Sequence, residues 1–191
     1  MADIKSHHMI HGALTDFVTG KKIVDTDDER YRQKLSRFLV EAKGYSKTDL
    51  EVGGKIETMF SGRFVVSRID IVVAIEARRL MLIRYGPGSL VTRERPALAA
   101  ARLFAPGYII PVTVVTNGEE AEILETRTGK VSGLGLDGIP DRSRLLALAE
   151  APLVPGPEGD RRERELRILN AFDLEVCCAG APCVLPNAPE G

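Results

Sequence analysis

The sequence predicts an α/β (α+β mixed) fold in which a central mixed β-sheet is flanked by helices. Three observations carry this prediction. Residues 27–43 have the apolar spacing of an amphipathic helix, residues 51–85 contain three extended stretches, and residues 92–126 combine an alanine-rich helix with a strand and a hairpin. A chain of 191 residues, 44% hydrophobic and 28% charged, is long enough for one such domain.

The first helix is expected over residues 27–43. Thr26 or Asp27 can cap it, and the acidic residues of its first turn complement the helix dipole. Gly44 suits its end. Apolar side chains recur at helical spacing along it, at Tyr31, Leu35, Phe38 and Leu39.

The next region predicts a β-meander. Its strands are expected over residues 51–59, 64–75 and 80–85, with residues 76–79 as the turn between the last two. An alanine-rich helix should follow over residues 92–104, because small side chains allow close packing on a sheet.

The second half of the chain predicts a hairpin and two helices. Residues 112–116 form a buried strand, and Asn117–Gly118 is a strong hairpin signal that leads into a strand over residues 121–126. Helices are expected over residues 141–150 and 161–172, whereas the glycine-rich residues 129–138 are interpreted as a loop.

These elements suggest one ordered domain with softer ends. We expect a flexible N-terminus over residues 1–13, the domain over 14–150, and a Pro/Gly linker over 151–160. A C-terminal helix over 161–174 and a Cys/Pro-containing tail over 175–191 complete the chain.

Charge and composition argue against three classes of protein, which are strongly basic nucleic-acid binders, membrane-spanning proteins and disulfide-rich proteins. The formal net charge of −1 lacks the basic excess of many dedicated nucleic-acid binders, so any site for a polyanion has to be local. No apolar run approaches the length of a membrane-spanning helix, and we expect a cytoplasmic protein with no membrane partner. An odd number of cysteines, three, argues against a disulfide framework.

Six segments, taken in their order along the chain, form a recognisable set, which is Asp16–Lys21, Asp28–Arg30, Phe38–Glu41, Arg68–Val73, Thr116–Gly118 and Ile139–Arg142. Together they resemble the N-terminal domain of type I restriction enzyme R subunits. The resemblance extends over roughly residues 14–175, which makes it more specific than one motif. That family belongs to the PD-(D/E)XK nucleases, so the resemblance implies a restriction-endonuclease-like sheet flanked by helices.

The resemblance also implies where catalytic residues would lie. Asp70 matches the family's aspartate on the second strand of the meander, and Glu29 matches a glutamate on the first helix. Such carboxylates would hold Mg²⁺, which prefers oxygen ligands. The third strand departs from the pattern, because Arg84 stands where a glutamate is expected and Gly86 where a lysine is expected.

This departure predicts a catalytically deficient site. A guanidinium is always charged and cannot ligate a cation, so we expect Arg84 to pair with Asp70 instead. Asp70 also has a simpler interpretation, as a buried aspartate paired with an arginine for structural reasons.

Arginines are concentrated in the part of the sequence that contains Asp70 and Arg84. Residues 61–102 carry a net charge of +5, which leaves −6 for the rest of a chain whose total is −1. These arginines could contact phosphates, or they could form a solvated, salt-bridged surface. The candidates for nucleic-acid binding are Arg63, Arg68, Arg84, Arg93 and Arg95.

The three cysteines form a second candidate site. Cys177, Cys178 and Cys183 could ligate zinc or part of an iron–sulfur cluster. They lack the paired Cys-x2-Cys spacing of a convincing metal site, so free thiols are the competing interpretation.

Three functions therefore stay open. The leading hypothesis is a catalytically deficient relative of the restriction nuclease domains that binds DNA weakly, or a protein partner, in a restriction or defence context and needs no cofactor. The second is a Mg²⁺-dependent deoxyribonuclease whose site is completed by a carboxylate from elsewhere, such as a second subunit. The third is a protein-interaction module that does not bind nucleic acid. No oligomeric state follows from the sequence.

Overall fold

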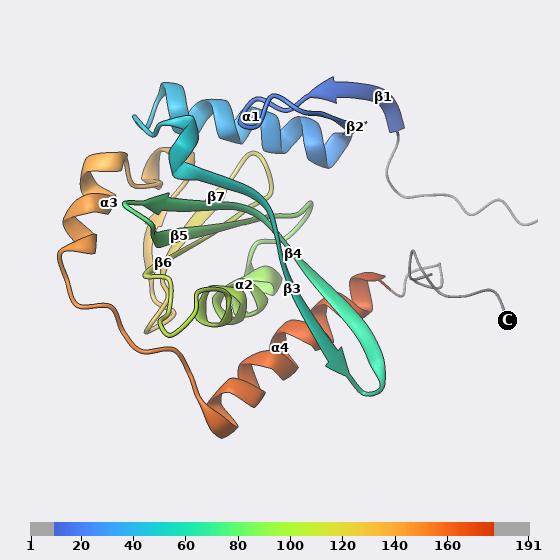
Figure 1. Cartoon of the computed structure of the whole chain (residues 1–191), viewed down its shortest axis with the longest axis vertical. Coiled ribbons are helices and arrows are strands. Elements are labelled where there is room, and N and C mark those ends of the chain that lie inside the picture. The colour runs from blue at the N-terminus through green and yellow to red at the C-terminus, as the bar shows by residue number, and fades with distance from the viewer. Residues whose placement is uncertain (1–9, 178–191) are drawn as a thin grey trace, which may run out of the picture.

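The computed structural model describes residues 10–177, and their centre is a six-stranded mixed sheet of order β3-β4-β5-β6-β7-β8. β5 and β6 pair in parallel, whereas the other neighbours in this sheet are antiparallel. The strands are β3 (Leu50–Phe60), β4 (Arg63–Ile75), β5 (Arg78–Tyr85), β6 (Val112–Thr116), β7 (Ala121–Glu125) and β8 (Val131–Leu134). The predicted mixed sheet flanked by helices is confirmed (Figure 1).

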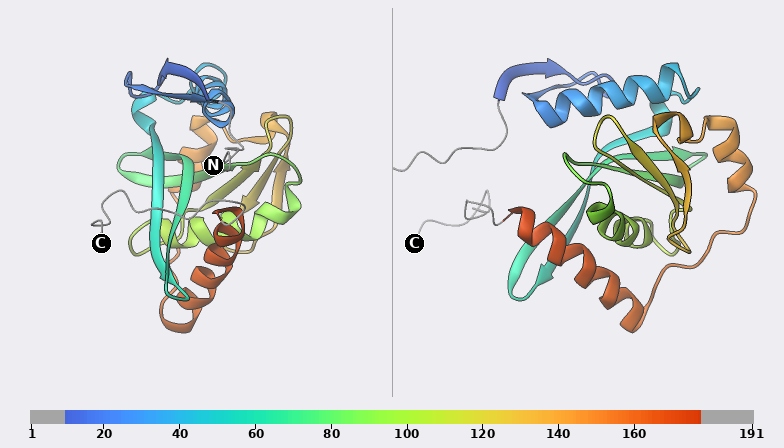
Figure 2. Two further views of the ribbon diagram at one scale, coloured as in Figure 1. Left: turned by 90° about the vertical axis from the view of Figure 1, so that its right-hand side faces the viewer. Right: turned by 180° about the vertical axis from the view of Figure 1, so that it is seen from behind.

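Helices cover both faces of this sheet (Figures 1 and 2). Side chains of α1 and α3 pack with one set of strand residues, and those of α2 and α4 pack with the other set. The result is a sandwich of three layers with an apolar core on each side of the sheet. The helices are α1 (Asp27–Glu41), α2 (Val91–Phe104), α3 (Arg142–Ala149) and α4 (Gly159–Cys177), with short 3₁₀ turns η1 (Lys47–Asp49) and η2 (Leu136–Gly138).

The predicted signals at the two ends of α1 are confirmed. Thr26 caps α1, because its hydroxyl accepts a hydrogen bond of 3.2 Å from the backbone N–H of Glu29. Gly44, just beyond the end of α1, has a φ of 74°, a conformation that suits glycine. Asp141 caps α3 in the same way, with the N–H of Arg144 as the donor at 2.8 Å.

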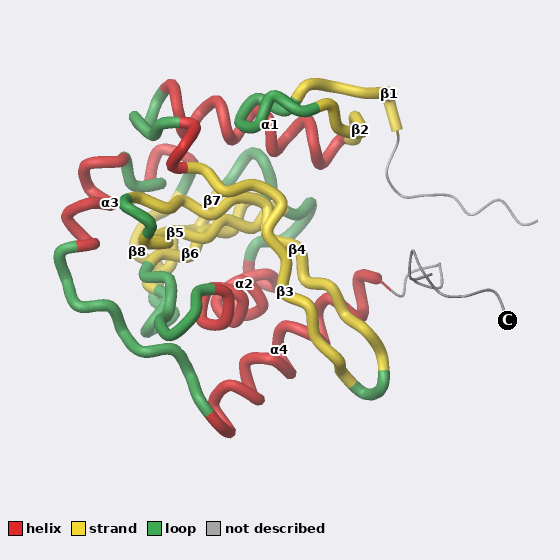
Figure 3. The backbone as a smooth tube through the Cα atoms, viewed as in Figure 1, coloured by secondary structure: helices red, strands yellow, loops and turns green. Residues whose placement is uncertain are grey.

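The sequence analysis missed three strands. β1 (Ile10–Thr15) and β2 (Lys22–Thr26) form a separate antiparallel hairpin, and β1 begins inside the range expected to be flexible. β8 and η2 lie within residues 129–138, so the interpretation of that segment as a plain loop was wrong. Figure 3 shows these strands among the loops that join them.

Two boundaries also differ from the predictions. The turn before β5 consists of Glu76 and Ala77 alone, both with positive φ, and the two arginines expected in that turn belong to β5. The segment before α4 is held by backbone hydrogen bonds from Ile109 to Val154 and from Gly156 to Gly107, of 2.9 and 3.0 Å. α4 then runs from Gly159 to Cys177, further in both directions than predicted.

Two further findings concern the described residues. No helix within residues 10–177 is long and apolar enough to cross a membrane. Of the candidate metal-binding cysteines, Cys177 ends α4, and Cys178 and Cys183 lie outside the described residues.

Candidate functional site

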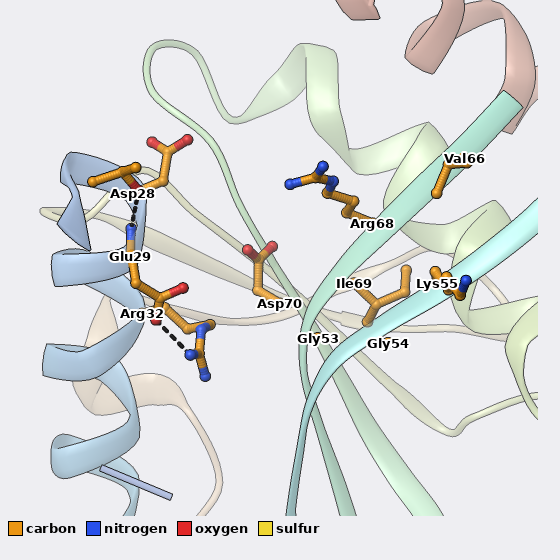
Figure 4. Close-up of a pocket in the computed structure, with 11 residues that line it drawn as sticks. Asp28, Glu29, Arg32, Gly53, Gly54, Lys55, Val66, Arg68, Ile69 and Asp70 are labelled. Atoms are coloured by element: carbon orange, nitrogen blue, oxygen red, sulfur yellow. Dashed lines mark hydrogen bonds and ion pairs between the residues drawn. The ribbon is translucent and has the colours of Figure 1, made fainter. Parts of the chain in front are cut away.

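A cavity of about 560 Å³ lies between α1 and the β3–β4 hairpin (Figure 4). Both acidic and basic side chains line it, and they come from the start of α1 and from the middle of the two strands. The lining residues are Thr26, Asp28, Glu29, Arg32, Gly53, Gly54, Lys55, Val66, Arg68, Ile69 and Asp70. The structure therefore brings Glu29 and Asp70 to the same concave face, as the resemblance implied.

Asp70 sits where β4 and β5 separate. The ladder between these strands ends at the pair Ile71 and Ile83, and one residue further on the carboxylate of Asp70 accepts a hydrogen bond of 2.8 Å from the backbone N–H of Tyr85. Gly53 faces Asp70 across the β3–β4 ladder, since the residues on either side pair as Val52 with Ile71 and Gly54 with Ile69. Because Gly53 has no side chain, the space beside Asp70 stays open.

The environment of Asp70 disfavours its charge. Burial raises the pKa of Asp70 from 3.8 to about 6, although the N–H of Tyr85 and the positive charge of Arg84 act in the opposite direction. The negative charge of Asp28, which lines the same cavity, adds to the increase. A buried carboxylate in a cavity whose pKa is raised toward neutral is a candidate functional group.

Replacing this carboxylate should stabilise the protein at alkaline pH. The folded pKa lies above the usual value, so the stability that Asp70 contributes is present below about pH 4 and is lost as the pH rises through about 6. Asp70→Asn keeps an acceptor for the N–H of Tyr85 and removes the charge. We expect it to raise the free energy of unfolding by about 1–3 kcal/mol at pH 8, with little effect at pH 4.

Denaturant unfolding of both proteins at pH 4, 6 and 8 measures this difference. Asp137→Asn is the matched control, because Asp137 is exposed and a surface substitution there should leave the free energy of unfolding nearly unchanged. A variant Asp70→Asn that is less stable than the parent at pH 8 would mean that the fold favours the charged carboxylate.

Glu29 is engaged within its own helix. Its carboxylate forms an ion pair with Arg32 and accepts a hydrogen bond of 2.7 Å from Gln33. Arg32 is 8% exposed and is also paired with Asp16, which lies in the turn between β1 and β2. Glu29 is therefore part of a buried ion-pair network, with fewer lone pairs left for a ligand in the cavity.

The predicted pairing of Arg84 with Asp70 is wrong. Nη2 of Arg84 lies 3.0 Å from Oδ1 of Asp173 on α4, and both side chains are largely buried. The guanidinium also lies 6.0 Å from the ring centroid of Phe172 on the same helix. Arg84 reaches α4 because it shares the face of β5 that packs against α2 and α4 with Leu82, two residues before it.

Gly86 makes room for another arginine. A Cβ at this position would lie 1.8 Å from Nη1 of Arg93, so a side chain here would displace that guanidinium from its position. Arg93 comes from the first turn of α2, donates a hydrogen bond of 2.6 Å to the carbonyl of Pro87, and lies 5.8 Å from the ring centroid of Phe172. A positive charge therefore lies beside the end of β5, and Arg93 of α2 supplies it.

The other predicted arginines do not form one cluster. Arg68 lines the cavity and points into it beside Asp70 (Figure 4). Arg63 lies at the turn of the β3–β4 hairpin, and Arg95 is exposed on α2. Of the five candidates for nucleic-acid binding, only Arg68 lines this cavity.

These residues do not fit the Mg²⁺ site that the family resemblance implies. Arg84 occupies the end of β5 and holds the nearby carboxylate of Asp173 in an ion pair. Within residues 10–177, no three His, Cys, Asp or Glu side chains gather closely enough to hold a metal ion. The carboxylates of Asp28, Glu29 and Asp70 line the cavity but lie too far apart to hold one Mg²⁺ together.

Sequence reasoning missed four residues of this region. Asp28 and Lys55 line the cavity, and Arg32 connects it to Asp16. A signal for Arg32 was present, since a residue three positions after Glu29 lies on the same helix face. Asp173 gave no signal, because its partner lies 89 residues earlier and only the packing of α4 brings them together.

The structure is a three-layer α/β domain. Its cavity lies between α1 and the β3–β4 hairpin and is lined by acidic and basic side chains. The family model described as "Type I restriction enzyme R protein N terminus (HSDR_N)" matches residues 27–140. The chain belongs to this family. The matched residues include α1, the whole six-stranded sheet and α2, whereas Asp16 and Asp173 lie outside them.

No curated protein and no solved structure matches the chain significantly.

Proposed function

We propose that this protein is a catalytically deficient member of the restriction R-protein family, with a PD-(D/E)XK ancestry, that binds DNA without cutting it in a restriction or defence context in the cytoplasm. One observation carries the proposal. Where the family pattern asks for a metal-binding glutamate, Arg84 is held by Asp173 of α4. The Arg84–Asp173 pair is neutral and cannot ligate a metal ion, and Arg93 of α2 adds a positive charge beside it, so the end of β5 suits a phosphate better than a metal ion.

The cavity supports contact with a phosphate backbone. Arg68 is exposed and points into the cavity, and Lys55 lies opposite it on the neighbouring strand. Lys55 is in contact with Glu57, so Arg68 supplies the net positive charge of this strand pair for a phosphate, and the acidic side chains on the α1 side limit the affinity. Weak binding that depends strongly on salt is the expected behaviour.

Retention on DNA–agarose or heparin at several salt concentrations tests this function. The full chain should be retained at low salt, and Arg68→Ala should weaken retention and lower the salt slope by about one unit, as for one lost phosphate contact. Arg127→Ala is the matched control, because Arg127 is 65% exposed at the other edge of the sheet and should leave retention unchanged. A chain that passes through both columns at low salt would contradict the proposal.

A Mg²⁺-dependent deoxyribonuclease is the second candidate, because Asp28, Glu29 and Asp70 line one cavity and a second subunit could add a further carboxylate. Incubation of plasmid DNA with Mg²⁺ or Mn²⁺ separates the two functions. Cleavage above background that disappears in Asp70→Ala would replace our proposal with this one.

A further inference from the structure

The β3–β4 hairpin extends beyond the rest of the sheet. β3 pairs with β4 as far as Phe60 and Arg63, whereas β5 pairs with β4 only over Ile71–Ile75. Residues 54–69 are therefore a two-stranded ribbon, and Figures 1 and 2 show its tip projecting from the molecule. The turn consists of Ser61 and Gly62 alone, with φ of 49° and 75°, as in a tight two-residue hairpin turn.

The two faces of this ribbon differ in their surroundings. One face packs against α4, where the hydroxyl of Thr58 donates a hydrogen bond of 2.7 Å to Oδ1 of Asn170, and where Ile56 and Ile69 join an apolar cluster with Leu169. This contact attaches one face of the ribbon to α4. The opposite face carries three cross-strand pairs, which are Lys55 with Arg68, Glu57 with Val66, and Met59 with Phe64.

The tip of that second face is apolar and exposed. Met59 is 67% exposed and Phe64 is 43% exposed, and directly opposite side chains on antiparallel strands lie about 5 Å apart. Two large apolar side chains at a projecting tip are costly to leave in water, and such a feature usually marks an interaction surface.

The charges around the tip indicate the kind of partner. Arg63 adjoins Phe64 at the turn, and Lys55 and Arg68 follow on the same ribbon. The acid on this face, Glu57, contacts Lys55 at 2.5 Å, so the face keeps a net positive charge. Apolar side chains flanked by cations are what proteins insert between base steps while they contact the adjacent phosphates.

We propose that the tip of the β3–β4 hairpin inserts Met59 and Phe64 between base steps of a DNA duplex bound along the exposed face of the ribbon. From Asp70 to Phe64 the ribbon measures about 20 Å, at about 3.3 Å per residue. At about 3.4 Å per base pair this length matches roughly six base pairs. Arg68 then contacts a phosphate near the cavity while the tip unstacks a step about half a helical turn away.

This inference rests on the proposed DNA binding, so the experiment measures binding and unstacking separately. A set of duplexes carries 2-aminopurine at successive positions, because its fluorescence rises when the base loses its stacking partners. Each duplex is titrated with the full chain at low salt while fluorescence anisotropy of an end label reports binding. We expect binding by anisotropy together with an increase in 2-aminopurine fluorescence at one or two adjacent positions.

The double variant Met59→Ser with Phe64→Ser should bind about tenfold more weakly and lose the increase in fluorescence. Both side chains are exposed, so an unchanged melting temperature verifies the fold. Leu134→Ser is the matched control, because Leu134 is 68% exposed on β8 and should alter neither signal.

The other outcomes separate the two ideas. Binding without a rise in fluorescence at any position would overturn the wedge and leave the proposed function in place, whereas absence of binding would overturn both. Sedimentation that shows a dimer for the parent chain and a monomer for the tip variant would assign Met59 and Phe64 to a contact between copies, which also overturns the wedge.

Discussion

Asp16→Ala is expected to lower the free energy of unfolding by about 3–5 kcal/mol, the range for removing one partner of a buried ion pair. Asp16 is 2% exposed and Arg32 is 8% exposed, so the substitution leaves a buried guanidinium with only Glu29 as its partner. The turn between β1 and β2 also loses an acceptor, because Asp16 accepts hydrogen bonds of 3.0 and 2.6 Å from the N–H groups of Val18 and Thr19.

The loss should depend on pH in a defined direction. Burial alone would raise the pKa of Asp16, but hydrogen bonds from Thr19, Arg32 and Gln33 outweigh it and hold the pKa well below 3.8. A depressed pKa contributes stability that is present above about pH 4 and is lost as the pH falls further. The difference between the parent chain and Asp16→Ala should therefore shrink below about pH 4.

Thermal and denaturant unfolding at pH 3, 5 and 7 measure this effect. Asp25→Ala is the control within the same hairpin, since Asp25 pairs with Arg30 at 2.7 Å but Arg30 is 50% exposed. Water can solvate Arg30 after the substitution, so the loss should be much smaller. Equal losses for the two variants would show that the buried ion pairs of Arg32 add no more to the free energy of unfolding than an exposed pair does.

Arg84→Ala is the second large effect that we expect, a destabilisation of about 2–4 kcal/mol. The side chain of Asp173 is 8% exposed, and without Arg84 its charge has no partner among the described residues. The pair is also incompletely satisfied, because Nη1 of Arg84 and Oδ2 of Asp173 are buried without hydrogen bonds. Replacing both residues with leucine should therefore recover most of the loss, as for other buried pairs replaced by apolar side chains.

Double-mutant cycles identify the partner of Arg84. The cycle of Arg84→Ala with Asp173→Ala should give a coupling energy of about 1–3 kcal/mol, whereas the cycle with Asp70→Ala should give a much smaller one. The reverse order of the two coupling energies would restore the pairing of Arg84 with Asp70 and would remove the observation on which the proposed function rests.

Local patterns accounted for most of the fold. The Ile/Val run of β4, the threonine cap of α1 and the Asn117–Gly118 turn are each determined by neighbouring residues, so a sequence shows them directly. β8 could not be predicted from the sequence. It is four residues long, contains Gly133 and is mostly exposed, so it lacks the alternation of apolar and polar residues that marks a strand.

The candidate site was only partly predictable. Glu29 and Asp70 could be assigned to one cavity through the family resemblance, and the catalytic role that it implies for them stays a prediction. The partner of Arg84 could not be predicted, because α4 meets β5 only in the folded chain. The close approach of Arg93 to Gly86 could not be predicted either, because it arises from the packing of α2 beside the end of β5.

The buried pair of Arg84 and Asp173 restricts how this chain could change its sequence. A glutamate at position 84 would face the buried carboxylate of Asp173, and two buried carboxylates side by side cannot both stay ionised without a large cost in stability. A protein has only about 5–15 kcal/mol of stability in total. A return to an acidic strand end therefore requires a second substitution at position 173, because either change alone leaves a buried charge without its partner.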